Sequence, residues 1–224
     1  MPVSKTEEHH MKIGIIGAGY IARAVAGVAT RAGYDVMISN TRGPRSLFTA
    51  VNIIGCKGGT VDEAAAFGDV VLVAIPLYAY DTIPAEPLTG KIVLDAGNYY
   101  PDRDGAIAAL DRHETTTSEI LAQHLPASQV VKVFNAILAG DIERDGTPTG
   151  TPDRRALPIA GDDAAAKTVV VGLLDAIGFD VVDAGDLSEG WRFEAGTPVY
   201  CVPRTVETLR EGLQATVRGA GVSA

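Results

Sequence analysis

A glycine-rich turn near the start of the chain has the residue types and spacing of a dinucleotide-binding site. Residues 14–22 read GIIGAGYIA and contain the G-x-G-x-x-A variant of the dinucleotide fingerprint. Gly17 would permit a tight turn, Gly19 would let the backbone approach a pyrophosphate, and Ala22 would allow a helix to pack closely on a strand. The alternative is a glycine-rich turn without a ligand. We predict that this turn binds cofactor phosphates through Gly17, Ala18, Gly19, Tyr20, Ile21 and Ala22.

A second polar stretch, about 20 residues further on, bears on which cofactor is bound. An NAD site usually carries Asp or Glu there, to bind the ribose 2′-hydroxyl. This stretch has no carboxylate, and Arg42 offers a planar guanidinium suited to phosphate oxygens. Arg45 is either a second phosphate ligand or a solvated charge. We therefore predict NADP(H) rather than NAD(H), bound through Ser39, Asn40, Thr41, Arg42 and Gly43.

Two turns that follow later strands are expected to border the nicotinamide. Ligands of open parallel sheets lie at the carboxyl ends of the strands. Ala74, Ile75 and Pro76 follow one apolar run, while Ala96 and Asn98 follow another. Small residues and proline would let backbone lie against the ribose and ring, and Asn98 could bind the carboxamide or a ribose hydroxyl. Ordinary strand-ending turns are the alternative interpretation.

Short β-branched runs alternate with longer alanine-rich stretches, which predicts an α/β fold with a doubly wound parallel Rossmann sheet and a small C-terminal α/β lobe. We predict a disordered leader over residues 1–10, a dinucleotide-binding domain over 11–150 and a substrate or dimerisation lobe over 151–224. Residues 140–155 have the composition of a linker or lid. The strands are expected at 12–16, 35–39, 56–59, 69–74, 91–95, 130–133, 156–160 and 180–182, and the helices at 20–32, 45–52, 61–67, 117–124, 162–177 and 204–217.

Composition limits the possible partners. The chain has 224 residues, 46% of them hydrophobic, and a net charge of −9, which disfavours nucleic acid and anionic membrane surfaces. No secretory signal is visible, and Cys56 and Cys201 have no metal-ligand spacing, as in reduced cytosolic proteins. We predict a cytoplasmic protein that binds a small molecule and no metal.

Taken together, the fingerprint, residues 39–44, the NYYP segment at 98–101 and the VKVFN segment at 131–135 resemble the F420-dependent NADP oxidoreductase family. The resemblance extends over residues 11–200, although Ala18 stands where classical members carry threonine. It implies hydride transfer between NADP(H) and the deazaflavin F420, with Thr41 and Arg42 binding the 2′-phosphate. The two rings react by proximity, so no catalytic residue is expected. The resemblance also implies a homodimer.

The electron acceptor is expected in a cleft between the two lobes, bound by Tyr99, Phe134, Asn135 and Trp191. Relatives include the cytoplasmic domain of the STEAP metalloreductases, which pairs NADPH with a flavin, so a flavin, a ferric chelate or another small acceptor is an alternative. An NADPH-binding sensor or scaffold without turnover is a third possibility. A short-chain reductase mechanism is disfavoured because no Tyr-x-x-x-Lys follows the paired tyrosines. Lys132 lies in a predicted strand, so a packing role is expected for it.

Overall fold

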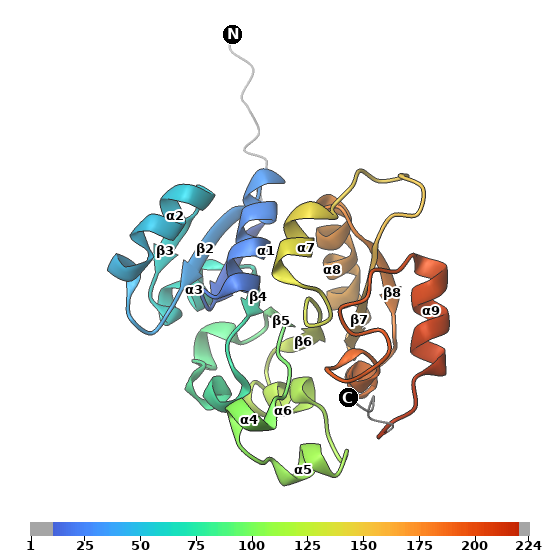
Figure 1. The fold of residues 1–224 in the computed structure, drawn as a ribbon. Helices are drawn as coiled ribbons and strands as arrows, with labels where there is room; N and C mark the ends of the chain where they lie inside the picture. Colours follow the sequence, from blue (N-terminus) through green and yellow to red (C-terminus); the bar gives the residue numbers. More distant parts are fainter. Residues whose placement is uncertain (1–10, 220–224) are drawn as a thin grey trace.

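The computed structural model describes residues 11–219 (Figure 1). The leader predicted over residues 1–10 and the end of the predicted C-terminal lobe lie outside this range. The strands are β1 Lys12–Ile16, β2 Asp35–Ser39, β3 Lys57–Gly59, β4 Val70–Val73, β5 Ile92–Asp95, β6 Gln129–Lys132, β7 Ala156–Gly161 and β8 Asp180–Asp183. The α-helices are α1 Tyr20–Arg31, α2 Phe48–Ile54, α3 Val61–Phe67, α4 Pro101–Asp104, α5 Ala108–Asp111, α6 Thr117–His124, α7 Ala139–Arg144, α8 Ala164–Ala176 and α9 Val206–Ala215, with 3-10 turns η1 Pro44–Leu47, η2 Leu77–Thr82, η3 Glu86–Leu88 and η4 Leu187–Phe193.

The strands form one mostly parallel sheet, which confirms the predicted fold class. Within residues 11–219 the order of its eight strands is β3-β2-β1-β4-β5-β6-β7-β8. The first six run in the order 3-2-1-4-5-6 of a doubly wound dinucleotide-binding sheet. In this order β1 lies between β2 and β4, with Ile13 paired to both Val36 and Val70. The loops after these strands therefore meet at one edge of the sheet.

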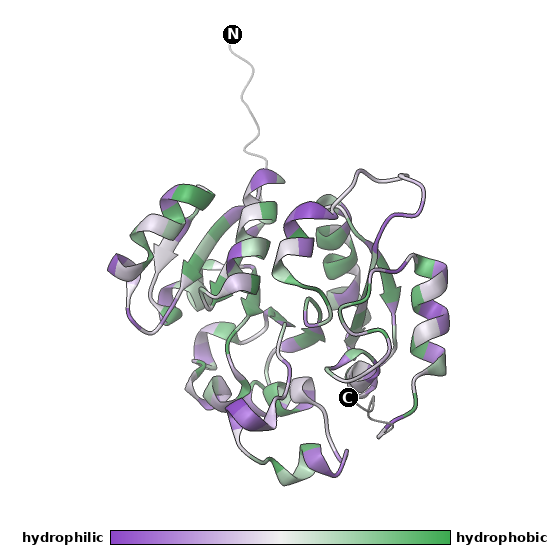
Figure 2. Cartoon of the chain, viewed as in Figure 1, coloured by the Kyte–Doolittle hydropathy of each residue, from purple (hydrophilic) through white to green (hydrophobic). Residues whose placement is uncertain are grey.

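The strands are apolar without alternation because helices cover both faces of the sheet. On one face Ile13, Ile15 and Leu72 pack in a cluster with α1 and α8. On the other face Val71 and Val93 pack with residues of α3 and α6. Figure 2 shows the hydrophobic strands inside and the hydrophilic residues mainly on the outer surfaces of the helices.

The C-terminal elements extend this sheet at the β6 edge. Strand β7 runs antiparallel to β6, with Lys132 paired to Ala160, and β8 then pairs parallel to β7. A separate apolar cluster, which includes Phe193, Leu209 and Leu213, packs α9 and the η4 region against these strands. The C-terminal part thus has some core of its own within a continuous sheet, and the boundary near residue 150 stays a prediction.

The segment predicted as a linker or lid is more ordered than its composition indicated. It begins with α7, which packs against α1 (Figure 1), and it ends at two buried arginines. Arg154 is paired with Asp175 and Asp180, while Arg155 donates to Asp141 and Asp145. Ion pairing allows both arginines to be buried.

Most expected elements appear within one or two residues of their predicted ends, and the differences concern short helices. The predicted helix 45–52 is divided into η1 and α2, and α9 is shorter than the predicted 204–217. The helices α4 and α5 were missed because each has only four residues, too short to show hydrophobic periodicity.

Candidate cofactor and acceptor site

The turn after β1 requires glycine at its first fingerprint position. Gly17 has φ +128°, and a Cβ there would lie 2.4 Å from the carbonyl oxygen of Ala74. Its backbone nitrogen donates to the Ser39 carbonyl at 3.1 Å. Gly17 therefore fixes the turn between β1 and α1 against the neighbouring strands, which is the role predicted for it.

Gly19 is different, because no protein atom requires its small size. It is the N-cap of α1, its backbone is extended, and a Cβ there would meet no atom within 4 Å. Neither a capping side chain nor an acidic residue satisfies the first turn of this helix. Free N–H groups at a helix N-terminus bind anions. The fully buried Ala22 lets the helix lie close to the sheet, so the turn fits a pyrophosphate against Gly19.

Alanine variants at Gly17 and Gly19 are expected to separate an effect on stability from an effect on NADPH binding. Gly19→Ala should leave the melting temperature nearly unchanged but weaken NADPH binding about tenfold or more, because its methyl group occupies the phosphate space. Gly17→Ala should lower the free energy of unfolding by about 1–3 kcal/mol through backbone strain and the contact with Ala74. Thermal unfolding and NADPH titration measure both effects. Unchanged NADPH affinity in Gly19→Ala would contradict the assignment.

The loop after β2 is held by side chains that were predicted to contact the cofactor. The buried Ser39 hydroxyl donates to the Ile15 carbonyl at 2.9 Å, so it faces β1. The Asn40 side chain donates to Ser46 Oγ at 2.9 Å and accepts from the backbone nitrogen of Arg42 at 3.0 Å. These two side chains therefore shape the loop, and their contact with the cofactor stays a prediction.

The exposed residues of that loop remain available to a ligand. Thr41 and Arg42 are exposed, and Gly43 turns the chain at φ +82° before η1. In the part of the chain that the structure describes, the Arg42 guanidinium has no hydrogen-bond or ion-pair partner. A planar cation without a carboxylate partner suits a phosphate monoester.

A cleft of about 460 Å³ lies at the carboxyl ends of β4, β5 and β6. It brings together residues predicted to contact the cofactor phosphates, the nicotinamide and the acceptor, which come from four segments of the chain. They are Gly19, Tyr20, Ile21, Ala74, Ile75, Pro76, Ala96, Asn98, Phe134 and Asn135.

Two asparagines form a buried amide pair in the cleft wall. Asn98 Nδ2 donates to the Asn135 carbonyl at 2.9 Å, and Asn135 Nδ2 donates to Asn98 Oδ1 at 3.2 Å and to the Phe193 carbonyl at 2.9 Å. The carboxamide of Asn98, predicted to bind cofactor, is thus engaged by Asn135. The pair ties the loops after β5 and β6 to the C-terminal part.

Several residues that line the cleft were not among the residues predicted individually for the site. The additional lining residues are Gly97, Tyr100, Arg103, Ile137, Leu138, Ala139, Tyr200 and Cys201. The NYYP segment contained a signal for Tyr100, but no motif indicated Tyr200 or Cys201, about 100 residues further on. Cys201 and Phe134 also have positive φ angles, +56° and +65°. Strained non-glycine residues of this kind gather at functional sites.

Arg103 is the one charged residue among the described residues that line the cleft. Its Nη2 lies 2.8 Å from Asp104 Oδ2 and 2.8 Å from the Asn98 carbonyl oxygen. Burial pushes the pKa of Asp104 upward, but the bonds from Arg103 and from backbone N–H groups outweigh burial and hold this pKa below its ordinary value. Asp104 therefore stays ionised and compensates Arg103, so the cleft wall carries little net charge.

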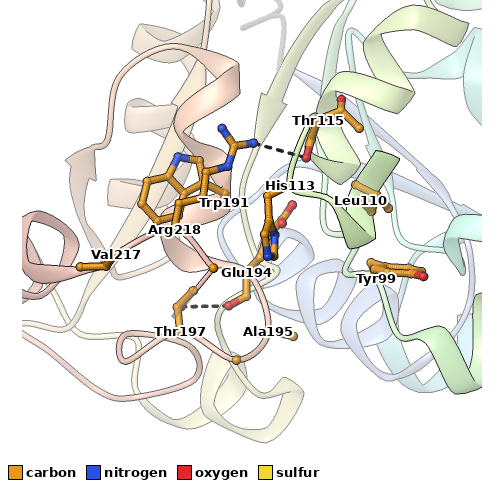
Figure 3. A pocket seen from close by; sticks show the side chains of 12 residues that line it. Tyr99, Leu110, His113, Thr115, Trp191, Glu194, Ala195, Thr197, Val217 and Arg218 are labelled. Atoms are coloured by element: carbon orange, nitrogen blue, oxygen red, sulfur yellow. Dashed lines mark hydrogen bonds between the residues drawn. The ribbon is translucent and has the colours of Figure 1, made fainter. Parts of the chain in front are cut away.

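Tyr99 and Trp191, both predicted to bind substrate, do not line this cleft. They lie with His113 in a second pocket of about 180 Å³ (Figure 3). The Tyr99 hydroxyl bonds to Asp111 at 2.8 Å and to the Gly105 carbonyl at 3.1 Å, which directs the ring toward α5. Arg192 lies over the Trp191 ring at 4.5 Å. The two side chains thus lie between the α5 region and the C-terminal part, and their contact with a substrate stays a prediction.

A buried ionic network lies behind the cleft. Lys132 is fully buried at the end of β6, and its Nζ lies 3.1 Å from Glu194 Oε1 and 4.0 Å from Asp95 Oδ2. It also donates to Thr117 Oγ1 at 2.6 Å and to the Gly97 carbonyl at 3.2 Å. Because its ammonium is fully engaged, Lys132 joins β5, α6 and the residue after η4 beneath the cleft loop at Gly97.

The ion pair of Glu194 is expected to make the free energy of unfolding fall at acidic pH. Burial pushes the pKa of Glu194 upward, but Lys132 and the bonds from Thr117 outweigh burial and lower it. A lowered carboxyl pKa contributes stability above the unfolded pKa of about 4.3, and this contribution is lost as the pH falls through the folded-state pKa. In Glu194→Gln the free energy of unfolding should therefore fall less steeply than in the wild type as the pH drops below about 4.3. Urea unfolding between neutral and acidic pH measures this, and an unchanged slope would contradict it.

Comparison with known proteins agrees with this geometry. The chain resembles a metalloreductase, STEAP3 of Rattus norvegicus, with 30% identity over 199 residues, which cover 86% of this chain and 37% of that protein. The chain thus spans well under half of this relative. A hypothetical protein from Sinorhizobium meliloti superposes with TM-score 0.77 at 28% identity, covering 89% of this chain and 97% of that one. A protein provisionally named an F420-dependent NADP reductase, from Arthrobacter sp. FB24, gives TM-score 0.67 at 28% identity, covering 79% and 85%.

These likenesses and the strand order define a Rossmann-type dinucleotide-binding protein. Residues 12–99 match the family model described as NADP oxidoreductase, coenzyme F420-dependent. This segment, which carries the fingerprint and the first five strands, is similar to members of that family. None of the helices within residues 11–219 is long and apolar enough to span a bilayer.

Proposed function

We propose that this protein is an oxidoreductase that transfers a hydride between NADP(H) and a small acceptor bound in the cleft. The observation that carries the proposal is the continuity of the site. The uncapped N-terminus of α1 at Gly19 opens into a cleft that reaches Tyr200, and the Arg42 loop follows the neighbouring strand β2. NADPH, when bound, supplies the hydride. The chain supplies binding and orientation, so proximity accounts for most of the catalysis.

The residues divide between the two ends of the cofactor. Gly19 and the first turn of α1 would hold the pyrophosphate, while Thr41 and Arg42 would hold the 2′-phosphate. Pro76 and Ala96 would border the nicotinamide, with the Asn98–Asn135 pair setting the distance to the acceptor. Residues after 150 would then form the acceptor side, since Tyr200 and Cys201 line that wall.

F420 is the first candidate for the acceptor. The matched family model and the name of the Arthrobacter relative support a deazaflavin. The cleft wall also suits a neutral planar ring, because Arg103, its charged residue within the described chain, is compensated by Asp104. A flavin or a ferric chelate is the second candidate, favoured by the likeness to STEAP3. We further propose a homodimer, as the family resemblance implies, and a cytoplasmic location, as the composition predicts.

Anaerobic oxidation of NADPH tests the proposal. F420, FMN, FAD and ferric citrate would be offered separately, and the loss of NADPH absorbance would be followed. Turnover with F420 alone is expected. Turnover with a flavin or with ferric citrate would move the acceptor to the second candidate. NADPH binding without turnover of any acceptor would contradict the enzymatic function and favour an NADPH-dependent sensor or scaffold.

A further inference from the structure

Two tyrosines from distant parts of the chain meet in the cleft wall. Tyr100 is the residue before α4, and Tyr200 lies in the turn between η4 and α9. Their hydroxyl oxygens lie 2.5 Å apart, and both residues line the cleft. The pair thus joins the loop after β5 to the C-terminal part on the acceptor side.

The pair leaves one hydroxyl hydrogen available to a ligand. When two hydroxyls bond to each other, one donates, and the accepting hydroxyl keeps its own hydrogen. Within the described residues, the one further polar group at either phenol oxygen is the Cys201 thiol beside Tyr200, which is a weak hydrogen-bond acceptor. Burial raises the pKa of Tyr200, and the bond with Tyr100 raises it further. The Tyr200 phenol therefore stays protonated in neutral solution.

The surroundings give the two phenols different access to water. Tyr100 is 38% exposed, and the Arg103 guanidinium covers its ring at 4.8 Å. Tyr200 is less exposed and packs against the C-terminal apolar cluster. Tyr200 thus lies nearer the protein interior, and Tyr100 connects it to solvent.

We propose, resting on the function proposed above, that Tyr200 is a catalytic residue that gives a proton to the acceptor and is reprotonated through Tyr100. The acceptor gains the electron pair with the hydride from the nicotinamide, which is oxidised to NADP⁺. The Tyr200 O–H bond breaks as a new N–H or O–H bond forms on the acceptor atom conjugated with the hydride-receiving atom. Tyr200 regains a proton from Tyr100, and Tyr100 regains one from water.

This assignment specifies the chemical class of the acceptor. A conjugated ring or a carbonyl compound takes a hydride and a proton, and so uses the tyrosine pair fully. A ferric chelate takes single electrons and no proton, so the pair would be idle. The geometry therefore points to a two-electron, proton-accepting substrate.

Phenylalanine variants test the proposal, because they keep the rings and remove the hydroxyls. Steady-state kinetics with F420 and with FMN would compare Tyr200→Phe, Tyr100→Phe and the control Tyr78→Phe, which changes an exposed tyrosine outside the cleft lining. Positioned proton transfer typically contributes about 10²–10⁴-fold in rate. We expect kcat to fall about 100-fold in Tyr200→Phe and less in Tyr100→Phe. The Kd for NADPH and the acceptor KM should change little.

The outcomes separate this proposal from the proposed function. A higher acceptor KM with unchanged kcat in Tyr200→Phe would mean that the pair is only a wall of the cleft, which overturns the proton-donor role. Wild-type kcat in both variants would overturn it as well, while the oxidoreductase function would stand. Wild-type protein that turns over no acceptor would overturn the proposed function and this inference with it. A Kd for NADPH equal to that of the wild type confirms that each variant is folded.

Discussion

Lys132→Met is expected to lower the free energy of unfolding by about 3–5 kcal/mol, because removing one partner of a buried ion pair leaves an uncompensated charge in the interior. Lys132 is fully buried, and Glu194 and Asp95 would both lose the ammonium. Methionine fills most of the lysine volume, so the lower free energy of unfolding would come from the unpaired charges and not from a cavity. Urea unfolding near neutral pH measures the change.

The matched control is an exposed ion pair. The side chains of Arg112 and Glu114 are 61% and 54% exposed. Arg112→Met breaks their ion pair and should leave the free energy of unfolding nearly unchanged. The double variant Lys132→Met with Glu194→Gln should recover part of the lost stability, since it removes a charge that Lys132 compensated. Equal stability of Lys132→Met and the wild type would contradict the account of this network.

Arg42→Ala is expected to weaken NADPH binding by about 1.5–3 kcal/mol and to leave NADH binding nearly unchanged, because a charge-assisted bond to a phosphate is lost only when the 2′-phosphate is present. Arg42 is exposed and its guanidinium has no partner within residues 11–219, and an alanine keeps the backbone bond to Asn40, so the variant should not alter the fold. Fluorescence titration with both nucleotides measures the two affinities.

Arg31→Ala serves as the control for net charge. Arg31 is exposed at the end of α1, far along the helix from Gly19, and its loss changes the charge of the protein by the same amount. This variant should bind NADPH like the wild type. Equal losses of NADPH and NADH affinity in Arg42→Ala would show that Arg42 acts through the loop and does not recognise the 2′-phosphate.

The sequence predicted the sheet well because its strands are buried on both faces. Runs such as Val70–Val73 have no polar alternation, and glycine or proline marks their ends. The order of β7 relative to β6 could not be predicted, since no local pattern specifies an antiparallel partner. Helix α7 was missed because its glycine and charged residues resemble a loop, although ion pairs at Arg155 hold the segment in place.

The candidate site was predictable where a backbone motif defines it and less so where side chains do. Gly17 and Gly19 follow from spacing alone. Tyr99 and Tyr100 are adjacent, and only the fold shows that Tyr99 turns toward Asp111 while Tyr100 lines the cleft. Tyr200 approaches Tyr100 from 100 residues away through tertiary packing, and a single sequence carries no signal for such a contact.

A crystal structure with NADP⁺ bound would test the central claim most directly. We predict the pyrophosphate at the N–H groups that follow Gly19, the 2′-phosphate beside Thr41 and Arg42, and the nicotinamide between Pro76 and Asn98, facing Tyr200. NADP⁺ bound in the pocket of Tyr99 and Trp191, or a 2′-phosphate without contact to the Arg42 loop, would contradict the account.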